Sequence, residues 1–143
     1  MANKQLIIDA DMSVEHKVMG LLACIAQEKK SEMGRLLKPS GLSILQLSIL
    51  HSLSFAPKKT LTVSDLKATL VDDNPNVSRT LNKLVDAGLV TKLRSEQDQR
   101  TVYVSITKAG EKAHTDADQL LLSQRIDLPE SEINALYEIL KKL

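Results

Sequence analysis

The chain has 143 residues, 43% of them apolar, and a formal net charge of +1. This length and apolar content suit one compact domain, or one domain with appended helices. With two tyrosines, one phenylalanine and no tryptophan, the chain offers little for base stacking, which argues against a single-stranded DNA or RNA binder.

Two further classes of protein are excluded by composition. The single cysteine, Cys24, rules out an intramolecular disulfide framework. No apolar run reaches the roughly 18 residues that cross a bilayer, and the N-terminus lacks the apolar core of a signal peptide. We therefore expect a cytoplasmic protein that does not associate with a membrane.

The N-terminal part of the chain predicts one long helix. Residues 1–12 are expected to form an irregular lead-in with a short apolar patch, Leu6-Ile7-Ile8. A helix from near Ser13 to Leu37 follows, because apolar residues recur at helical spacing until Pro39 and Gly41 end the pattern. A helix of this length in a small chain indicates packing against something beyond its own domain.

The next segment predicts a buried helix and the start of a helix-turn-helix. Ser43 and Gln46 form a capping-box pattern. The helix that they begin runs to about Phe55 and is apolar on most sides, as expected of a central helix. Residues 60–62 are expected to form a short strand that joins a wing, and residues 63–70 the first helix of the helix-turn-helix.

A turn at residues 71–73 leads to a second helix, which Asn74 is expected to cap, with Pro75 at its first position and Gly88 at its end. One face is apolar at helical spacing and comprises Val77, Leu81, Leu84 and Val85. Four polar residues share another face: Asn76, Arg79, Thr80 and Lys83. Arginine can pair with guanine and asparagine with adenine, so this face suits a major groove, although such a face taken alone is more often a solvated helix surface.

The segment that follows favours the DNA interpretation. Residues 91–94 lead into a polar loop, residues 95–100, and apolar residues then alternate with polar ones over residues 102–106, so a two-stranded hairpin is predicted. Arg100 would reach a minor groove from the end of this loop. Residues 74–110 hold six basic and three acidic residues, so this segment carries +3 and the rest of the chain −2.

The stretch GLVTKLRSEQDQRTVYVSITKAG, residues 88–110, resembles the wing signature of the MarR family of bacterial transcription regulators. The matching positions are Gly88-Leu89-Val90, Lys92, Asp98-Gln99-Arg100, Val102, Val104 and Ile106-Thr107-Lys108-Ala109-Gly110. Lys92 and Gln99 replace frequent arginines and Ile106 replaces the usual leucine. The change at Gln99 reduces the positive charge of the wing.

This resemblance implies roles for particular residues. Arg100 would be the minor-groove arginine, Arg79 a major-groove or phosphate contact, and Asp98 the carboxylate that braces the wing. Ser78-Arg79 stands where the family often has Thr-Arg in its recognition helix. The candidate DNA-binding residues are Asn76, Ser78, Arg79, Thr80, Lys83, Arg94 and Arg100.

Two more helices are expected after the wing, from Thr107 to about Arg125 and from about Pro129 to Lys142. The flanking helices would form either a monomeric cap or, as the resemblance implies, a dimer interface. The resemblance divides the chain into an N-terminal dimerisation helix (residues 1–38), a winged helix DNA-binding region (residues 42–106) and C-terminal dimerisation helices (residues 107–143). The expected fold is mainly α with a small β-hairpin wing (α+β).

The resemblance also implies a function. It is that of a sequence-specific regulator of transcription that binds double-stranded DNA as a homodimer on a pseudo-palindromic operator. It would act as a repressor, relieved by a small aromatic ligand. Two alternatives stay open, namely a winged helix that binds protein rather than DNA, and a regulator in which Cys24 senses redox state rather than serving as a buried structural cysteine.

Other chemistry is weakly indicated. The histidines, His16, His51 and His114, are too scattered in the sequence for a metal motif and are interpreted as ordinary surface or core residues. There is no glycine-flanked serine nucleophile, phosphate-cradling glycine loop or paired-carboxylate motif. We therefore expect no metal site, no cofactor and no enzymatic activity.

Overall fold

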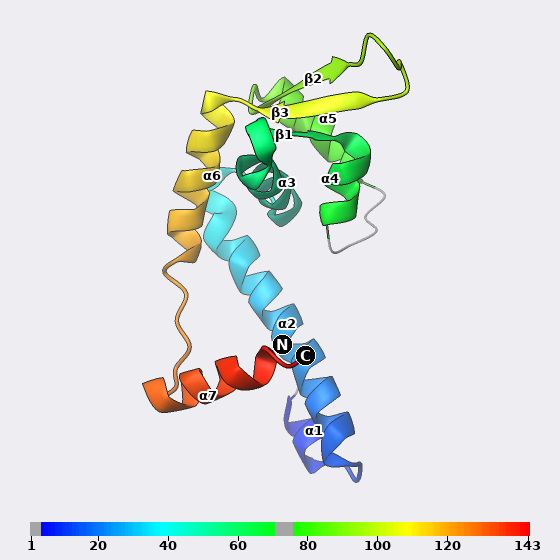
Figure 1. The fold of residues 1–143 in the computed structure, drawn as a ribbon. Helices are drawn as coiled ribbons and strands as arrows, with labels where there is room; N and C mark the ends of the chain where they lie inside the picture. Colours follow the sequence, from blue (N-terminus) through cyan, green and yellow to red (C-terminus); the bar gives the residue numbers. More distant parts are fainter. Residues whose placement is uncertain (1–3, 71–75) are drawn as a thin grey trace.

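The computed structural model describes residues 4–70 and 76–143 (Figure 1). Its elements in chain order are α1 (Lys4–Asp9), α2 (Val14–Leu37), the short 3-10 helix η1 (Lys38–Ser40), α3 (Ile44–Phe55), a second short 3-10 helix η2 (Pro57–Lys59), β1 (Thr60–Thr62), α4 (Val63–Thr69), α5 (Val77–Asp86), β2 (Val90–Arg94), β3 (Val102–Ile106), α6 (Lys108–Leu121) and α7 (Glu130–Leu140). The predicted mainly α fold with a small wing is confirmed.

Residues 4–9 form helix α1, so the expectation of an irregular lead-in was wrong. The amide of Gln5 donates to the Asp9 carboxylate one turn later at 2.9 Å, and Lys4 forms an ion pair with Glu28 of α2 at 2.7 Å. The side chain of Ile7 lies against Gly20 of α2, where a Cβ would be 3.3 Å from its methyl groups. The apolar patch is therefore helical because one of its residues packs on the next helix.

Helix α2 extends away from the sheet, and α1 and α7 lie at the end of the molecule remote from the wing (Figure 1). Ser13 caps α2 by accepting from the backbone N–H of His16, as the sequence predicted for the start of this helix. Leu37, at the other end, is its one buried residue. Gly41 then turns the chain with a left-handed φ of 71°.

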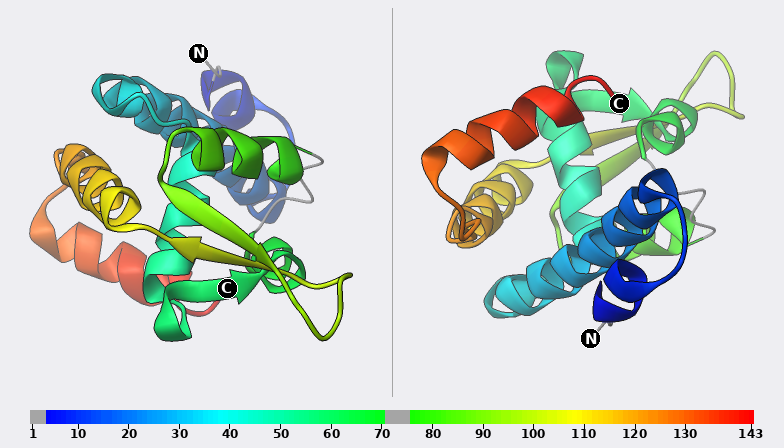
Figure 2. Two further views of the ribbon diagram at one scale, coloured as in Figure 1. Left: turned by 90° about the horizontal axis from the view of Figure 1, so that it is seen from above. Right: turned by 90° about the horizontal axis from the view of Figure 1, so that it is seen from below.

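The main core surrounds α3, which lies at the centre of the winged helix with α6 on one side and α4 and α5 on the other (Figure 2). The predicted capping box of Ser43 and Gln46 is present, with both reciprocal hydrogen bonds formed. Within the described residues, nine buried apolar side chains make up this core: Ile49, Leu50, Leu53, Leu66, Val77, Leu81, Leu84, Val90 and Val104. The predicted apolar stripe of α5 thus faces α3.

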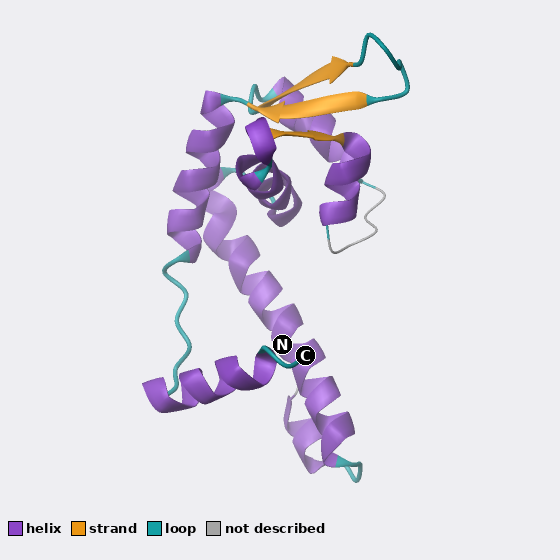
Figure 3. Cartoon of the chain, in the orientation of Figure 1, coloured by secondary structure: helices purple, strands orange, loops and turns teal. Residues whose placement is uncertain are grey.

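The three strands form one antiparallel sheet in the order β1-β3-β2 (Figure 3). The predicted short strand at residues 60–62 is confirmed, because Leu61 pairs with Val104 of β3. The hydroxyl oxygens of Thr60 and Ser105, on paired residues, are 2.7 Å apart. This pairing fixes the base of the wing to the segment that leads into α4.

The junction between the wing and α6 is tightly packed. Thr107 caps α6 by accepting from the N–H of Gly110, and its own hydroxyl donates to the carbonyl of Gly88 at 2.8 Å. A Cβ on Gly110 would lie 2.1 Å from the carbonyl oxygen of Leu89. The Thr-x-x-Gly part of the wing signature is therefore a packing requirement, since only glycine lets α6 approach the strand so closely.

The C-terminal helices differ from expectation in one boundary. Helix α6 ends at Leu121 rather than at about Arg125. Carbonyls at its end accept hydrogen bonds from side chains, which compete with continuation of the helix. The Ser123 hydroxyl donates to the carbonyl of Leu120 at 2.7 Å, and Arg125 donates to that of Leu122 at 2.6 Å. Helix α7 is present as predicted, and it contains no buried residue. Among the described residues, none of the helices combines the length and apolar character that a bilayer span requires.

The predicted turn at residues 71–73, the cap at Asn74 and the first helical position at Pro75 lie outside the described residues. Within the described part, α5 runs from Val77 to Asp86. Gly88 follows it with a φ of 73°, as expected of the residue that ends this helix.

Candidate nucleic-acid interface

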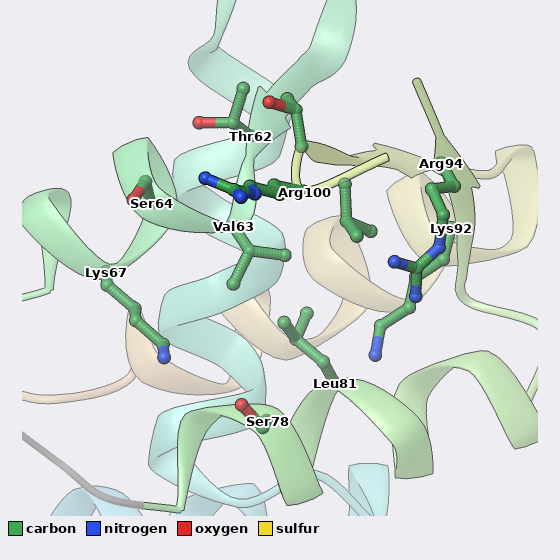
Figure 4. A pocket seen from close by; sticks show the side chains of 11 residues that line it. Thr62, Val63, Ser64, Lys67, Ser78, Leu81, Lys92, Arg94 and Arg100 are labelled. Carbon is green, nitrogen blue, oxygen red and sulfur yellow. The ribbon is translucent and has the colours of Figure 1, made fainter. Parts of the chain in front are cut away.

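A groove of about 640 Å³ lies between α4, α5 and the wing (Figure 4). Its described lining comprises Thr62, Val63, Ser64, Lys67, Ser78, Leu81, Lys92, Arg94, Arg100, Thr101 and Val102. The charged members of this set are all basic, two lysines and two arginines, and they stand around the apolar side chains of Val63 and Leu81 (Figure 4). The groove therefore concentrates positive charge at the junction of three elements.

Helix α5 is held so that one side is buried and the other faces solvent. Val77, Leu81 and Leu84 anchor it to the core. Because successive residues are about 100° apart around a helix, Arg79 and Lys83 point away from this buried side, and both are exposed. The side chains of Arg79 and Lys83 thus project from the outer face of α5. The helix is held in place by its buried residues on the opposite face.

The side of α5 nearest the wing is linked to it. The ammonium group of Lys92, on β2, donates to the side-chain oxygen of Asn82 at 2.7 Å. Ser78, one turn earlier on α5, lines the groove. This hydrogen bond joins the wing to α5 directly, in addition to the packing of β2 against α5.

The loop of the wing is closed by local hydrogen bonds. The Asp98 carboxylate accepts from the backbone N–H of Arg100 at 3.0 Å, and the backbone N–H of Ser95 donates to the carbonyl of Thr101 at 2.9 Å. Arg94 donates to the carbonyl of Gln99 at 2.6 Å. These bonds turn the chain so that the side chain of Arg100 lies over the groove (Figure 4).

The candidate DNA-binding residues fall into two groups. Ser78, Arg94 and Arg100 line the groove. The others lie on the outer part of α5 or at its start, with Asn76, Arg79 and Lys83 exposed and Thr80 partly exposed. The first group lies at the junction of α5 with the wing, and the second extends over the solvent-facing part of α5.

Five polar residues of the described groove lining were not among the candidates from the sequence: Thr62, Ser64, Lys67, Lys92 and Thr101. The spacing of Ser64 and Lys67, three residues apart on a helix whose Leu66 is buried, places them on its open side. That spacing was visible in the sequence. What was not visible is that this side of α4 meets the wing.

A second cavity, of about 510 Å³, lies between the central helix α3, the end of α4, and the flanking helices α2 and α6. Its described lining comprises Lys30, Met33, Ile44, Leu45, Leu47, Ser48, His51, Ser52, Thr69, Leu70, Asp118 and Leu121. It is largely apolar with a few polar groups, which is the usual character of a small-molecule site.

Two of the scattered histidines meet in space. The rings of His51 on α3 and His114 on α6 approach to 3.0 Å between nitrogen atoms, although the two residues are 63 positions apart in the chain. Distance in the sequence was therefore the wrong criterion for this pair. Cys24 lies on α2 and is half-buried, and its redox role stays a prediction.

Comparison with known proteins agrees with this geometry. Residues 20–117 match the family described as transcriptional regulator SarA/Rot. The organic hydroperoxide resistance transcriptional regulator of Bacillus subtilis (strain 168) is 29% identical over 118 residues, 82% of this chain and 74% of that protein. The multiple antibiotic resistance protein MarR of Escherichia coli (strain K12) is 29% identical over 128 residues, 86% of this chain and 88% of that protein.

Solved structures of E. coli MarR resemble the chain over nearly its whole length. The wild-type apo form has a TM-score of 0.78 at 25% identity, covering 94% of this chain and 98% of that one. A mutant MarR complexed with operator DNA has a TM-score of 0.74 at 27% identity, covering 93% and 98% of the two chains.

Proposed function

This chain belongs to the SarA/Rot family of transcriptional regulators, and we propose that it regulates transcription by binding double-stranded DNA sequence-specifically, as a cytoplasmic homodimer that represses its target. The resemblance to the MarR family, first noted in the wing, is confirmed by the relatives and the solved structures.

The observation that carries the proposal is the basic groove between the exposed face of α5 and the wing. An α-helix fits the major groove of B-DNA, and Arg79 and Lys83 would project from α5 toward bases or phosphates there. Arg100 would then enter the neighbouring minor groove, where negative potential is concentrated in narrow A·T segments. Lys67 and Lys92, between the two, would contact the intervening phosphates.

Two features support a homodimer. Helix α7 buries none of its residues in this chain, so a monomeric cap would leave its apolar side chains in water. The exposed apolar residues of the flanking helices are Leu6, Ile8, Val14, Val18, Met19, Ile25, Leu136, Tyr137, Ile139 and Leu140. Such an extended apolar surface is typical of an interface between subunits, and a two-fold dimer would present two recognition helices to a pseudo-palindromic operator.

The cavity between α2, α3, α4 and α6 supports the expected small aromatic ligand. It lies where the flanking helices meet the winged helix, and its lining includes Leu45 of α3, Leu121 of α6, and Leu70, which directly follows α4. A ligand there would change the position of each winged helix relative to the flanking helices of the dimer, and so the spacing between the two recognition helices. Simultaneous binding to both half-sites is lost when that geometry changes, which would relieve repression.

The test of DNA binding uses fluorescence anisotropy with duplex DNA from the region upstream of the protein's own gene, and scrambled duplex as competitor. Arg100→Ala is expected to weaken binding by about 10- to 100-fold and to reduce the salt dependence over roughly 50–200 mM by about one released counterion. The matched control is Lys112→Ala, which removes an exposed positive charge on α6. Lys112→Ala should bind as the wild type does.

Equal loss of affinity in both variants would mean that only total charge matters, and would contradict the groove geometry. Weak binding that is the same for both duplexes and unaffected by Arg100→Ala would favour the alternative, a winged helix that binds protein. Circular dichroism of each variant shows that the fold is retained.

A further inference from the structure

Three potential metal ligands converge where α3 meets α6. The Nδ1 atom of His51 is 3.0 Å from Nε2 of His114, and the same Nε2 atom is 3.2 Å from the Asp118 carboxylate. All three ligand atoms lie within 4.8 Å of one another. His114 and Asp118 share one face of α6 because they are one helical turn apart.

These separations are close to those within a metal coordination sphere. Nitrogen and oxygen ligands bind Zn²⁺ at about 2.0–2.1 Å, so two ligands of a tetrahedral ion lie about 3.3 Å apart. Both contacts of His114 are within a few tenths of an ångström of that value. Only the gap between His51 and Asp118 would need to close, and the Asp118 side chain is 40% exposed and so has room to move.

The site combines a fixed ligand with accessible ones. His114 is buried, with 6% of its surface exposed, so packing holds its ring in place. His51 is exposed, and both it and Asp118 line the cavity between α3 and the flanking helices. Phe55, the single phenylalanine of the chain, packs its ring 4.7 Å from that of His51 and 6.2 Å from that of His114. An ion could thus enter from the cavity and meet one ligand, His114, that packing already orients, beside the ring of Phe55.

We propose that His51, His114 and Asp118 bind one divalent transition-metal ion. Two imidazoles and a carboxylate match Zn²⁺ better than Mg²⁺ or Ca²⁺, which prefer oxygen ligands. Three protein ligands leave a fourth position that opens on the cavity and accepts water or a donor atom of a small molecule.

The position of the site suggests what the ion does. His51 is on the central helix of the winged-helix core, whereas His114 and Asp118 are on α6, which directly follows β3 of the wing. An ion bound by both helices would clamp them together and fix the angle at which the winged helix meets the flanking helices. This regulatory consequence rests on the proposed function, but metal binding itself does not.

Metal binding can be measured without DNA. The full-length protein is stripped with a chelator, dialysed, and titrated with Co²⁺, whose visible absorption reports coordination number, and Zn²⁺ is then added to displace it. We expect one ion per chain. His51→Ala and Asp118→Asn, both at accessible positions, should each weaken binding at least about 10- to 100-fold, the size of effect that even outer-shell changes produce.

Two control variants remove the remaining imidazole and the thiol of the chain, which are the other side chains with a strong preference for Zn²⁺. His16→Ala and Cys24→Ser change the third histidine and the single cysteine and should leave affinity within about twofold, since neither touches the site. Thermal unfolding without metal checks that each variant is folded. Loss of binding in Cys24→Ser, or unchanged binding in His51→Ala, would overturn the assignment.

Absence of saturable Co²⁺ and Zn²⁺ binding at micromolar concentration would also overturn it, and would leave an ordinary hydrogen bond between two histidines. If metal binds and DNA affinity is then measured with and without Zn²⁺, a change that disappears in His51→Ala supports the clamp. A metal effect on DNA that persists in His51→Ala contradicts it. The anisotropy of the metal-free protein tests DNA binding separately.

Discussion

The winged helix buries many of its large apolar side chains, whereas α1, α2 and α7 leave many of theirs exposed. Nine of the described apolar residues of the winged helix are buried together around α3. In α2, which has 24 residues, the single buried residue is Leu37, at the end that touches the winged helix. Within the described residues, α1 and α7 bury none.

The difference lies in what covers each surface. Val14 of α2 is 76% exposed and Leu6 of α1 is 70% exposed. Both are apolar side chains on helices that have further exposed apolar residues. Burial of apolar surface contributes roughly 25 cal/mol per Å², so an uncovered apolar face of this extent favours association. The winged helix is stabilised by its own chain, whereas the flanking helices leave apolar side chains exposed, which is the basis for the proposed second copy.

The largest effect is expected from breaking the surface of α7. Leu136→Glu combined with Leu140→Glu puts two charges on a face where Leu136 is 37% and Leu140 45% exposed in the single chain. Burying an unpaired carboxylate at an interface costs several kcal/mol, so the dimer should be lost completely. Analytical ultracentrifugation measures the mass, and circular dichroism should show that the winged helix remains folded.

The control for this variant is Leu93→Glu on β2, where the leucine is 72% exposed. It adds a charge at an exposed apolar residue of the wing and should leave the dimer intact. A double variant that stays dimeric would show that α7 lies outside the interface, and the comparison between the two regions would then need another explanation.

A smaller but still large effect is expected inside the winged helix. Leu50 is fully buried against the other residues of the main core, so Leu50→Ala should lower the free energy of unfolding by about 2–5 kcal/mol. Leu93→Ala makes the same chemical change at an exposed position and should alter it by less than about 0.5 kcal/mol. Urea unfolding followed by circular dichroism measures both.

This pair also separates the two sources of stability. The difference between Leu50→Ala and Leu93→Ala should not depend on protein concentration, because it arises within one chain. Stability contributed by a dimer interface rises with concentration. A Leu50→Ala effect that grew or shrank markedly with concentration would mean that the winged helix also depends on its partner.

The parts of the fold that could be predicted are those set by neighbours in the sequence. The capping pair Ser43 and Gln46 predicted the start of α3, and Thr107 predicted the start of α6. The alternation of apolar and polar residues after Arg100 predicted β3. Each of these signals acts within one helical turn or one strand. The stripe of α5 could be predicted for the same reason, since one period of spacing defines its buried face.

What could not be predicted depends on contacts between distant segments. Helix α1 was missed because Ile7 acquires its partner, Gly20, only after the chain folds back on α2. The pair of His51 and His114 was missed because α3 and α6 are adjacent only in the folded molecule. The place of Lys67 in the groove lining could not be predicted for the same reason. The pattern of its own helix indicates that Lys67 is exposed, but not that it faces the wing.

The smallest effect, and the one that tests the join between the two regions, is expected at Gly110. A Cβ there would lie 2.1 Å from the carbonyl oxygen of Leu89 and 2.7 Å from the side chain of Ile106. Because the first neighbour is backbone, α6 must shift away from the wing. Gly110→Ala should lower the free energy of unfolding by about 1–3 kcal/mol, the usual cost of overpacking, as measured by urea unfolding.

Gly34→Ala provides the matched control, because it makes the same change within a helix at a place with room. The Cβ at residue 34 would lie 3.9 Å from a methyl carbon of Ile44, which is an ordinary van der Waals distance. Alanine is favoured over glycine in a helix interior by about 0.8–1.0 kcal/mol, so this variant should be more stable than the wild type. Opposite signs for the two variants would show that Gly110 is required by its contact with Leu89 and not by a general need for flexibility. If Gly110→Ala were as stable as Gly34→Ala, α6 would not be held tightly against the wing, and a change among the flanking helices could not be transmitted to the winged helix through that contact.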